Sequence, residues 1–74
     1  MDIKFVYALC LVYGNYRAAI AVVDDAGRGV DALVNVIATG KALLALQEAL
    51  KVEVADTEQV EIAIDSARQA FLEN

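Results

Sequence analysis

The sequence contains no histidine and no proline, and Cys10 is its only cysteine. Histidine is the commonest general base and metal ligand, and the usual serine and cysteine nucleophiles depend on it. A single cysteine excludes an internal disulfide, so we expect a reducing, cytoplasmic location. Cys10 lies in the most apolar stretch, where we expect a packed and unreactive thiol. We therefore predict a protein that is not an enzyme and holds no metal or cofactor.

Basic side chains are also scarce: six Lys and Arg stand against eleven Asp and Glu, and the net charge is −5. Without a basic patch, direct binding to nucleic acid is disfavoured. The apolar run of residues 5–13 is shorter than a bilayer requires. The longer window 3–23 is interrupted by Gly14, Asn15 and Arg17. We expect no membrane partner.

Apolar residues are abundant, at 59% of a chain of only 74 residues. We interpret residues 1–74 as one domain, because no linker, repeat or low-complexity segment divides them. A domain of this size has a large surface for its volume and cannot hide so many apolar side chains alone. We therefore expect a homo-oligomer, or a subunit that a protein partner covers.

The fold predicted from these patterns is α+β. Val, Ile and aromatic residues favour strands in the first half of the chain, where DDAGRG and Tyr13-Gly14-Asn15-Tyr16 resemble hairpin turns. Asp56, with Gln59 three residues later, predicts the start of a final helix. Residues 51–54 would add a short edge strand. The prediction is an antiparallel meander of strands 3–12, 17–23 and 30–38, with helices 41–51 and 57–73 on one face.

An antiparallel bundle of three helices, 2–24, 29–51 and 57–73, is the alternative. Fourteen alanines and the absence of proline favour it. A continuous helix from Val30 would, however, place Asp31 and Asn35 on the side rich in leucine and alanine, where two polar groups would be buried. This argument favours a strand before Gly40.

Three motifs are typical of nucleotide or metal sites, but each is incomplete. Asp24 and Asp25 lack the spacing of a calcium-binding loop and suit a turn. Residues 27–32 match a dinucleotide-binding glycine pattern, but the chain has no room for the parallel sheet that this pattern requires. Residues 35–42 resemble a phosphate loop without its first glycine and its closing hydroxyl. We assign none of them a ligand.

The candidates for contact with a protein partner come from three groups. Tyrosines of the first segments are of the type enriched at interface hot spots. One side of the segment around residues 31–37 is mixed in polarity. Acidic residues line one face of the final helix. The candidates are Tyr7, Tyr13, Tyr16, Asp31, Leu33, Asn35, Ile37, Glu58, Glu61 and Asp65.

The order of a strand, a strand with IAVVDDAG, a strand with ALVNVIATGK and a helix opened by DTEQVE resembles small phage-encoded anti-CRISPR proteins that bind the type I-F surveillance complex. The resemblance covers about two thirds of the chain. It implies an inhibitor that blocks a larger nucleoprotein complex, with Tyr7 as the residue that matches a contact position. The C-terminal layout is also similar to antitoxins of the HicB kind. These resemblances imply a binder of another protein, whereas the apolar excess alone is equally consistent with a small self-assembling accessory subunit.

Overall fold

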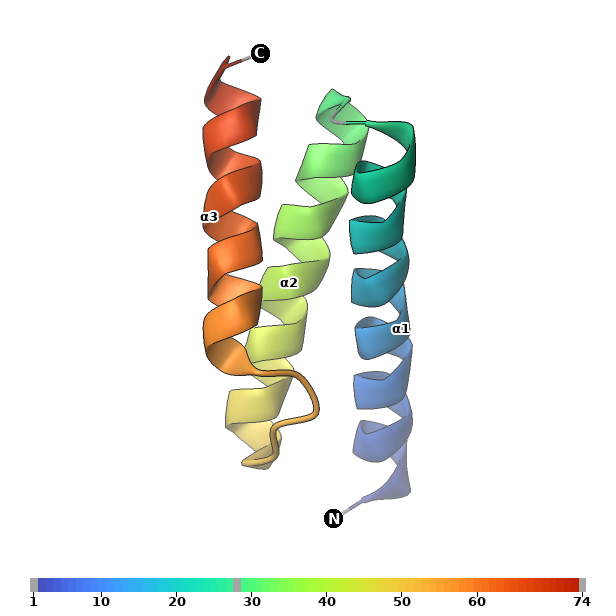
Figure 1. Cartoon of the computed structure of the whole chain (residues 1–74). Helices are drawn as coiled ribbons and strands as arrows, with labels where there is room; N and C mark the ends of the chain where they lie inside the picture. Colours follow the sequence, from blue (N-terminus) through green and yellow to red (C-terminus); the bar gives the residue numbers. More distant parts are fainter. Residues whose placement is uncertain (1, 28, 74) are drawn as a thin grey trace.

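The computed structural model describes residues 2–27 and 29–73, and these form three helices and no strand. They are α1 (Ile3–Ala26), α2 (Val30–Leu50) and α3 (Thr57–Glu73). The helices run up, down and up in a body of 41 × 19 × 14 Å, with α2 between the other two (Figure 1). The predicted α+β meander is therefore wrong, and the three-helix alternative describes the architecture.

The strands predicted over 3–12 and 17–23 are both part of α1, and the expected turn over 13–16 lies in the middle of that helix. The inward-facing residues of α1 recur every three or four positions, as a helix requires. They are Leu9, Val12, Tyr16, Ala19 and Val23. The residues between them are also largely apolar, so the helical period does not stand out from its background. β-Propensity outweighed it in the prediction, although such propensity depends strongly on context.

The strand predicted over 30–38 and the helix start near Gly40 are wrong as well, because α2 begins at Val30 and continues through both segments. The face that α2 buries is not its leucine–alanine side. It consists of Leu33, Val36, Gly40, Leu43 and Gln47. Asp31 and Asn35 lie outside this face and are exposed. The burial of two polar groups, which argued against a continuous helix, therefore does not occur.

The helix predicted over 57–73 is confirmed as α3. The Asp56 carboxylate accepts hydrogen bonds from the backbone N–H groups of Glu58 and Gln59, at 2.9 and 3.4 Å. It thereby satisfies two of the donors that a helix start leaves free. The edge strand expected over 51–54 is wrong: Lys51 ends α2 in a left-handed conformation with φ of 57°, and an irregular loop follows.

The side chain of Gln47 on α2 holds this loop in place by hydrogen bonds. This side chain is only 4% exposed, although glutamine is mostly found at protein surfaces. Its Oε1 accepts hydrogen bonds from the backbone N–H groups of Val54 at 2.9 Å and Ala55 at 2.8 Å. A single side chain thus replaces water as the partner of two loop amides, and it fixes the direction in which the chain enters α3.

Gly40 allows α2 and α3 to approach closely. A Cβ atom at this position would lie 2.8 Å from Cγ1 and 3.0 Å from Cδ1 of Ile64. The isoleucine side chain therefore occupies the space that any other residue at position 40 would need. Glycine weakens a helix interior, and here close packing against α3 offsets that cost.

We expect Gly40→Leu to lower the free energy of unfolding by about 1–2 kcal/mol, because the larger side chain must displace Ile64 from a packed site. Urea titration followed by circular dichroism measures the change. Ala42→Leu is the matched control, since Ala42 lies on the same helix and is exposed. Equal stability of the two variants would contradict the close approach of α2 and α3.

Candidate interaction surface

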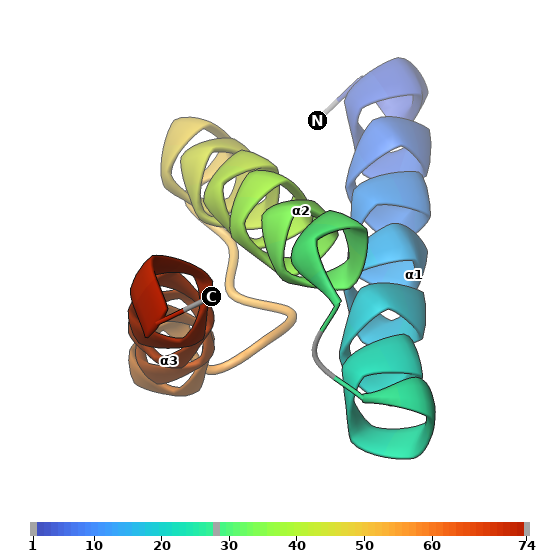
Figure 2. The same cartoon turned by 90° about the horizontal axis from the view of Figure 1, so that it is seen from above.

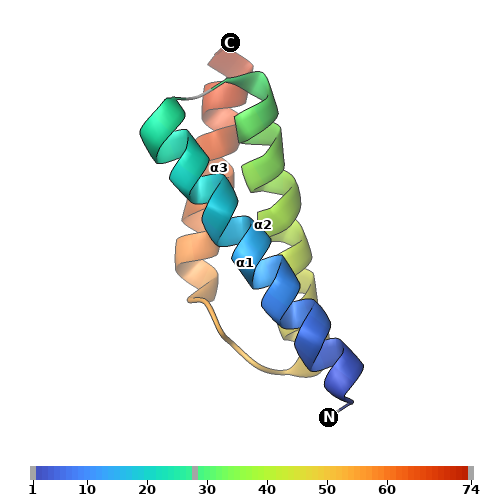
Figure 3. The same ribbon diagram turned by 90° about the vertical axis from the view of Figure 1, so that its right-hand side faces the viewer.

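Helix α1 is covered on one side only. Its backbone packs against α2 and does not approach α3, as the view from above shows (Figure 2). Inward side chains of α1, Leu9 and Tyr16, join Leu43 of α2 and Val60 and Ile64 of α3 in one core cluster. Viewed from its own side, α1 lies across the front of the molecule with nothing over it (Figure 3).

The uncovered side carries large apolar residues that are well exposed, among them Tyr7 at 67% and Leu11 at 51%. Their spacing of three and four continues through smaller side chains to the end of the helix, so they form one row. All members of the row are exposed. We call the outer face of α1 the row Lys4, Tyr7, Leu11, Gly14, Ala18, Ala21 and Asp25.

Cys10 lies beside this row and is an exposed free thiol. The expectation of a packed core cysteine is therefore wrong. The apolar neighbours that suggested a core surround Cys10 in the sequence, but on a helix they are distributed around the whole circumference. Apolar composition alone did not indicate which side of the helix would face the core.

Arg17 is the one basic residue near the middle of α1. Its guanidinium carbon lies 5.7 Å from the centroid of the Tyr13 ring, within the range of a cation–π contact. Tyr13 itself is partly buried against the core. Arg17 thus lies along the side of the helix, and the outer face keeps its apolar centre.

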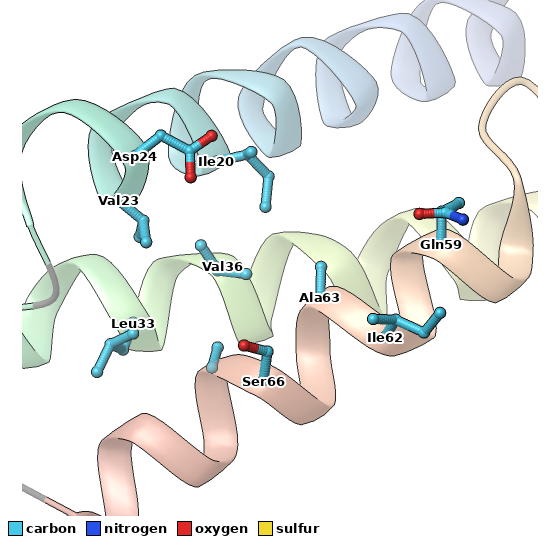
Figure 4. A pocket seen from close by; sticks show the side chains of 10 residues that line it. Ile20, Val23, Asp24, Leu33, Val36, Gln59, Ile62, Ala63 and Ser66 are labelled. Atoms are coloured by element: carbon cyan, nitrogen blue, oxygen red, sulfur yellow. The ribbon is translucent and has the colours of Figure 1, made fainter.

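A groove with a volume of about 270 Å³ lies between α1 and α3, and side chains of α2 also line it (Figure 4). We call it the inter-helix groove. Apolar side chains from all three helices form most of its wall, among them Ile20, Leu33 and Ile62. Among the described residues that line it, Asp24 is the only one with a charge, so they offer an apolar contact but no pair of groups for acid–base chemistry.

The three candidate tyrosines do not share a surface. Tyr7 is exposed on the outer face, Tyr13 is partly buried, and Tyr16 belongs to the core. Burial raises the pKa of the Tyr16 hydroxyl above its ordinary value, so this phenol stays neutral at physiological pH. Of the three, only Tyr7 is placed to meet a partner with most of its ring.

The candidates within residues 31–37 also divide into buried and exposed residues. Leu33 is buried in the core and Ile37 is partly buried, so both contribute to packing. Asp31 and Asn35 are exposed one helical turn apart on α2. They border a shallow hollow that Val22 of α1 shares with them.

The acidic candidates Glu58, Glu61 and Asp65 are exposed along one side of α3, as predicted. Asp65 Oδ1 lies 3.7 Å from Nη1 of Arg68, so part of this charge is compensated within the helix. Glu53 lies in the loop before α3, and hydrogen bonds from the backbone N–H and the hydroxyl of Thr57 lower the pKa of its carboxyl. The described residues contain no group of three or more His, Cys, Asp or Glu side chains that could hold a metal ion.

Most of the outer face was missed by the sequence analysis: of its members only Tyr7 was a candidate. The signal that would have found Leu11, Gly14, Ala18 and Ala21 is their spacing of three and four from Tyr7. It becomes visible only when residues 3–26 are treated as one helix, and the prediction divided them between two strands.

Within residues 2–27 and 29–73, two helices are long and apolar enough to cross a membrane by length and composition alone. They are Ile3–Asp25, with a mean hydropathy of 1.5, and Val30–Leu50, with 1.3. Core helices of water-soluble proteins pass the same test, but they are mostly buried, whereas only 17% and 28% of these windows are. An N-terminal signal sequence passes it too. Both helices therefore expose much apolar surface, and α1 exposes the larger share.

Comparison with protein-family models, with curated proteins and with solved structures finds no match for this chain. The segments that carry the resemblance to anti-CRISPR proteins, IAVVDDAG and ALVNVIATGK, belong to α1, its following turn and α2 rather than to a sheet. The surface of the folded chain is therefore the remaining indication of what this protein binds.

Proposed function

We propose that this protein is a non-enzymatic interaction module that binds protein through the outer face of α1. The observation that supports this proposal is the uncovered side of α1: a helix of 24 residues that is apolar around its circumference packs on one side only. Helices that are apolar all round are normally covered on every side.

The free energy available from covering this face is substantial. Each Å² of apolar surface removed from water contributes about 25 cal/mol, so burying side chains such as Tyr7 and Leu11 contributes several kcal/mol before the costs of association. Contiguous apolar patches of this kind mark interaction sites on soluble proteins. Tyr7, the residue that the resemblance singles out, belongs to the row.

A protein partner fits the charges of the helices better than a lipid one. Arg17 lies near the middle of α1 and Lys41 near the middle of α2, and both are exposed. In a spanning hairpin each would lie near the bilayer centre, at a cost of about 2.5–3.5 kcal/mol per residue. The net charge of −5 disfavours nucleic acid in the same way.

The test is a pair of matched substitutions of exposed apolar residues by glutamate. Leu11→Glu places a charge on the outer face, and Ile62→Glu places one in the inter-helix groove. We expect Leu11→Glu to abolish association with protein while the helical circular dichroism signal is retained, and Ile62→Glu to leave association intact. Association is measured by light scattering of the purified chain and by co-purification.

Two outcomes would overturn the proposal. Association that survives Leu11→Glu would move the interface away from α1, and loss with Ile62→Glu alone would move it to the groove. Flotation of the wild-type chain with phospholipid vesicles, abolished by Leu11→Glu, would show instead that the outer face meets a membrane.

A further inference from the structure

We infer that the partner of the outer face is a second copy of this chain, and that two α1 helices pack antiparallel with their contact centred next to Gly14. This inference rests on the proposed function, because it requires that the outer face binds protein. Three independent properties of the row favour a second copy: the sizes of its side chains, the charges at its ends and the glycine at its centre.

The side chains of the row are large in its first half and small in its second half. Tyr7 and Leu11 precede Gly14, whereas Ala18 and Ala21 follow it. An antiparallel pair whose two-fold axis passes beside Gly14 places Leu11 opposite Ala18 of the other copy. Tyr7 then lies within one helical step of Ala21. Each large side chain then meets a small one. A parallel pair would crowd the large residues at one end and leave a gap at the other.

The charges at the two ends of the row are opposite and complementary under the same arrangement. Lys4 at the start comes opposite Asp25 at the end of the other copy, with Asp24 adjacent. The one ion pair found within the described part of the chain is Asp65–Arg68, so neither Lys4 nor Asp25 has such a partner there. A parallel pair would instead place lysine beside lysine and aspartate beside aspartate, which costs free energy.

No contact among the described residues of a single copy requires a glycine at position 14. Among the described residues, no atom that could limit a side chain lies within 4 Å of where its Cβ would be. Glycine in a helix interior weakens the helix, and Gly40 shows the compensation that this fold uses elsewhere, a close approach of another helix. Gly14 and Ala18, four positions apart, would permit the same close approach between two α1 helices.

The length of the row suits an interface between two helices. From Lys4 to Asp25 it extends about 32 Å at a rise of 1.5 Å per residue, which is nearly all of α1. Because the same row supplies both sides, the interface is two-fold symmetric and closes with two copies. The predicted assembly is therefore a dimer.

Disulfide trapping tests the antiparallel register directly, because Cys10 is exposed beside the row. In the proposed dimer Cys10, the neighbour of Leu11, lies next to residue 18 of the other copy, so we expect Ala18→Cys to form a covalent dimer under mild oxidation. Within one helix these two positions are about 12 Å apart, too far for an internal bridge. The wild-type chain, and Cys10→Ser combined with Ala18→Cys, each have one thiol off the two-fold axis and should stay uncrosslinked.

A crosslinked wild-type dimer would indicate Cys10 beside Cys10, and it would overturn the antiparallel arrangement. Absence of crosslinking in the Ala18→Cys chain, when the chain is dimeric by mass, would overturn the register. Sedimentation equilibrium supplies that mass, and we expect twice the 7.9 kDa of one chain.

Gly14→Leu tests the centre of the interface without a clash inside the monomer. We expect it to raise the dissociation constant of the dimer about a hundredfold, while Ala42→Leu on the exposed side of α2 leaves it unchanged. If the wild-type chain is a monomer, but Leu11→Glu abolishes binding to a different protein, the dimer fails and the proposed function stands. If Leu11→Glu alters no association at all, both fail.

Discussion

Replacing Leu43 by alanine is expected to lower the free energy of unfolding by about 3–5 kcal/mol. The Leu43 side chain is 0% exposed, and it lies where all three helices meet. It contacts a cluster that includes Leu9 of α1 and Ile64 of α3. Truncation therefore removes apolar burial and leaves a cavity that cannot close without moving two helices.

This loss is large for the size of the molecule. A domain of 74 residues has about 4–11 kcal/mol of stability in total. Leu43→Ala should therefore lose a large part of its stability and unfold at a clearly lower urea concentration than the wild-type chain, as urea titration of the helical signal will show. Leu72→Ala makes the same chemical change at a site that is 78% exposed, and we expect it to cost less than about 0.5 kcal/mol. Similar costs for both variants would contradict the central position of α2.

Gln47→Met is expected to destabilise the fold by about 2–3 kcal/mol and to release the loop before α3. Methionine fills a similar volume but has no acceptor, so the N–H groups of Val54 and Ala55 lose their partner. Each unsatisfied amide costs about 1–3 kcal/mol. Part of this cost is offset, because the Gln47 amide nitrogen is itself buried without a partner among the described residues, and methionine removes it.

Native-state hydrogen exchange distinguishes the lost hydrogen bonds from lost packing. We expect the amides of Val54 and Ala55 to exchange much faster in Gln47→Met. Gln47→Glu keeps the acceptor oxygens, so these two amides should stay protected at neutral pH. Gln69→Met is the control for the substitution itself, because Gln69 is exposed on α3. Unchanged exchange at Val54 and Ala55 in Gln47→Met would show that the loop does not depend on this side chain.

Buried residues recur with the helical period in all three helices, but this period could be recognised from the sequence only in α3. Helix α3 alternates apolar and charged faces, and its Asp56 cap marks the start, so it was predicted with the correct bounds. In α1 both faces are apolar, and contrast between faces is what an amphipathic pattern requires. The apolar outer face of α1, which we propose to be functional, is thus the reason that α1 was not recognised as an amphipathic helix.

The error in α2 had a different cause. Its buried row contains Gly40, which has no side chain to mark a core face, and Gln47, a residue type that is mostly exposed. The glycine is buried because Ile64 occupies the space above it, and the glutamine because it serves two loop amides. Both reasons are contacts with α3 or its preceding loop, and they do not exist until the chain has folded.

By itself, the sequence determined that this protein lacks the histidine-based groups of most catalytic sites, that it has more apolar side chains than so small a body can hide, and that it ends in a capped amphipathic helix. These properties follow from composition and from contacts within a few residues. Tertiary structure decided which face α2 buries and which row of α1 stays uncovered. A helix with two apolar sides can turn either one inward, and only packing against the other two helices selects between them.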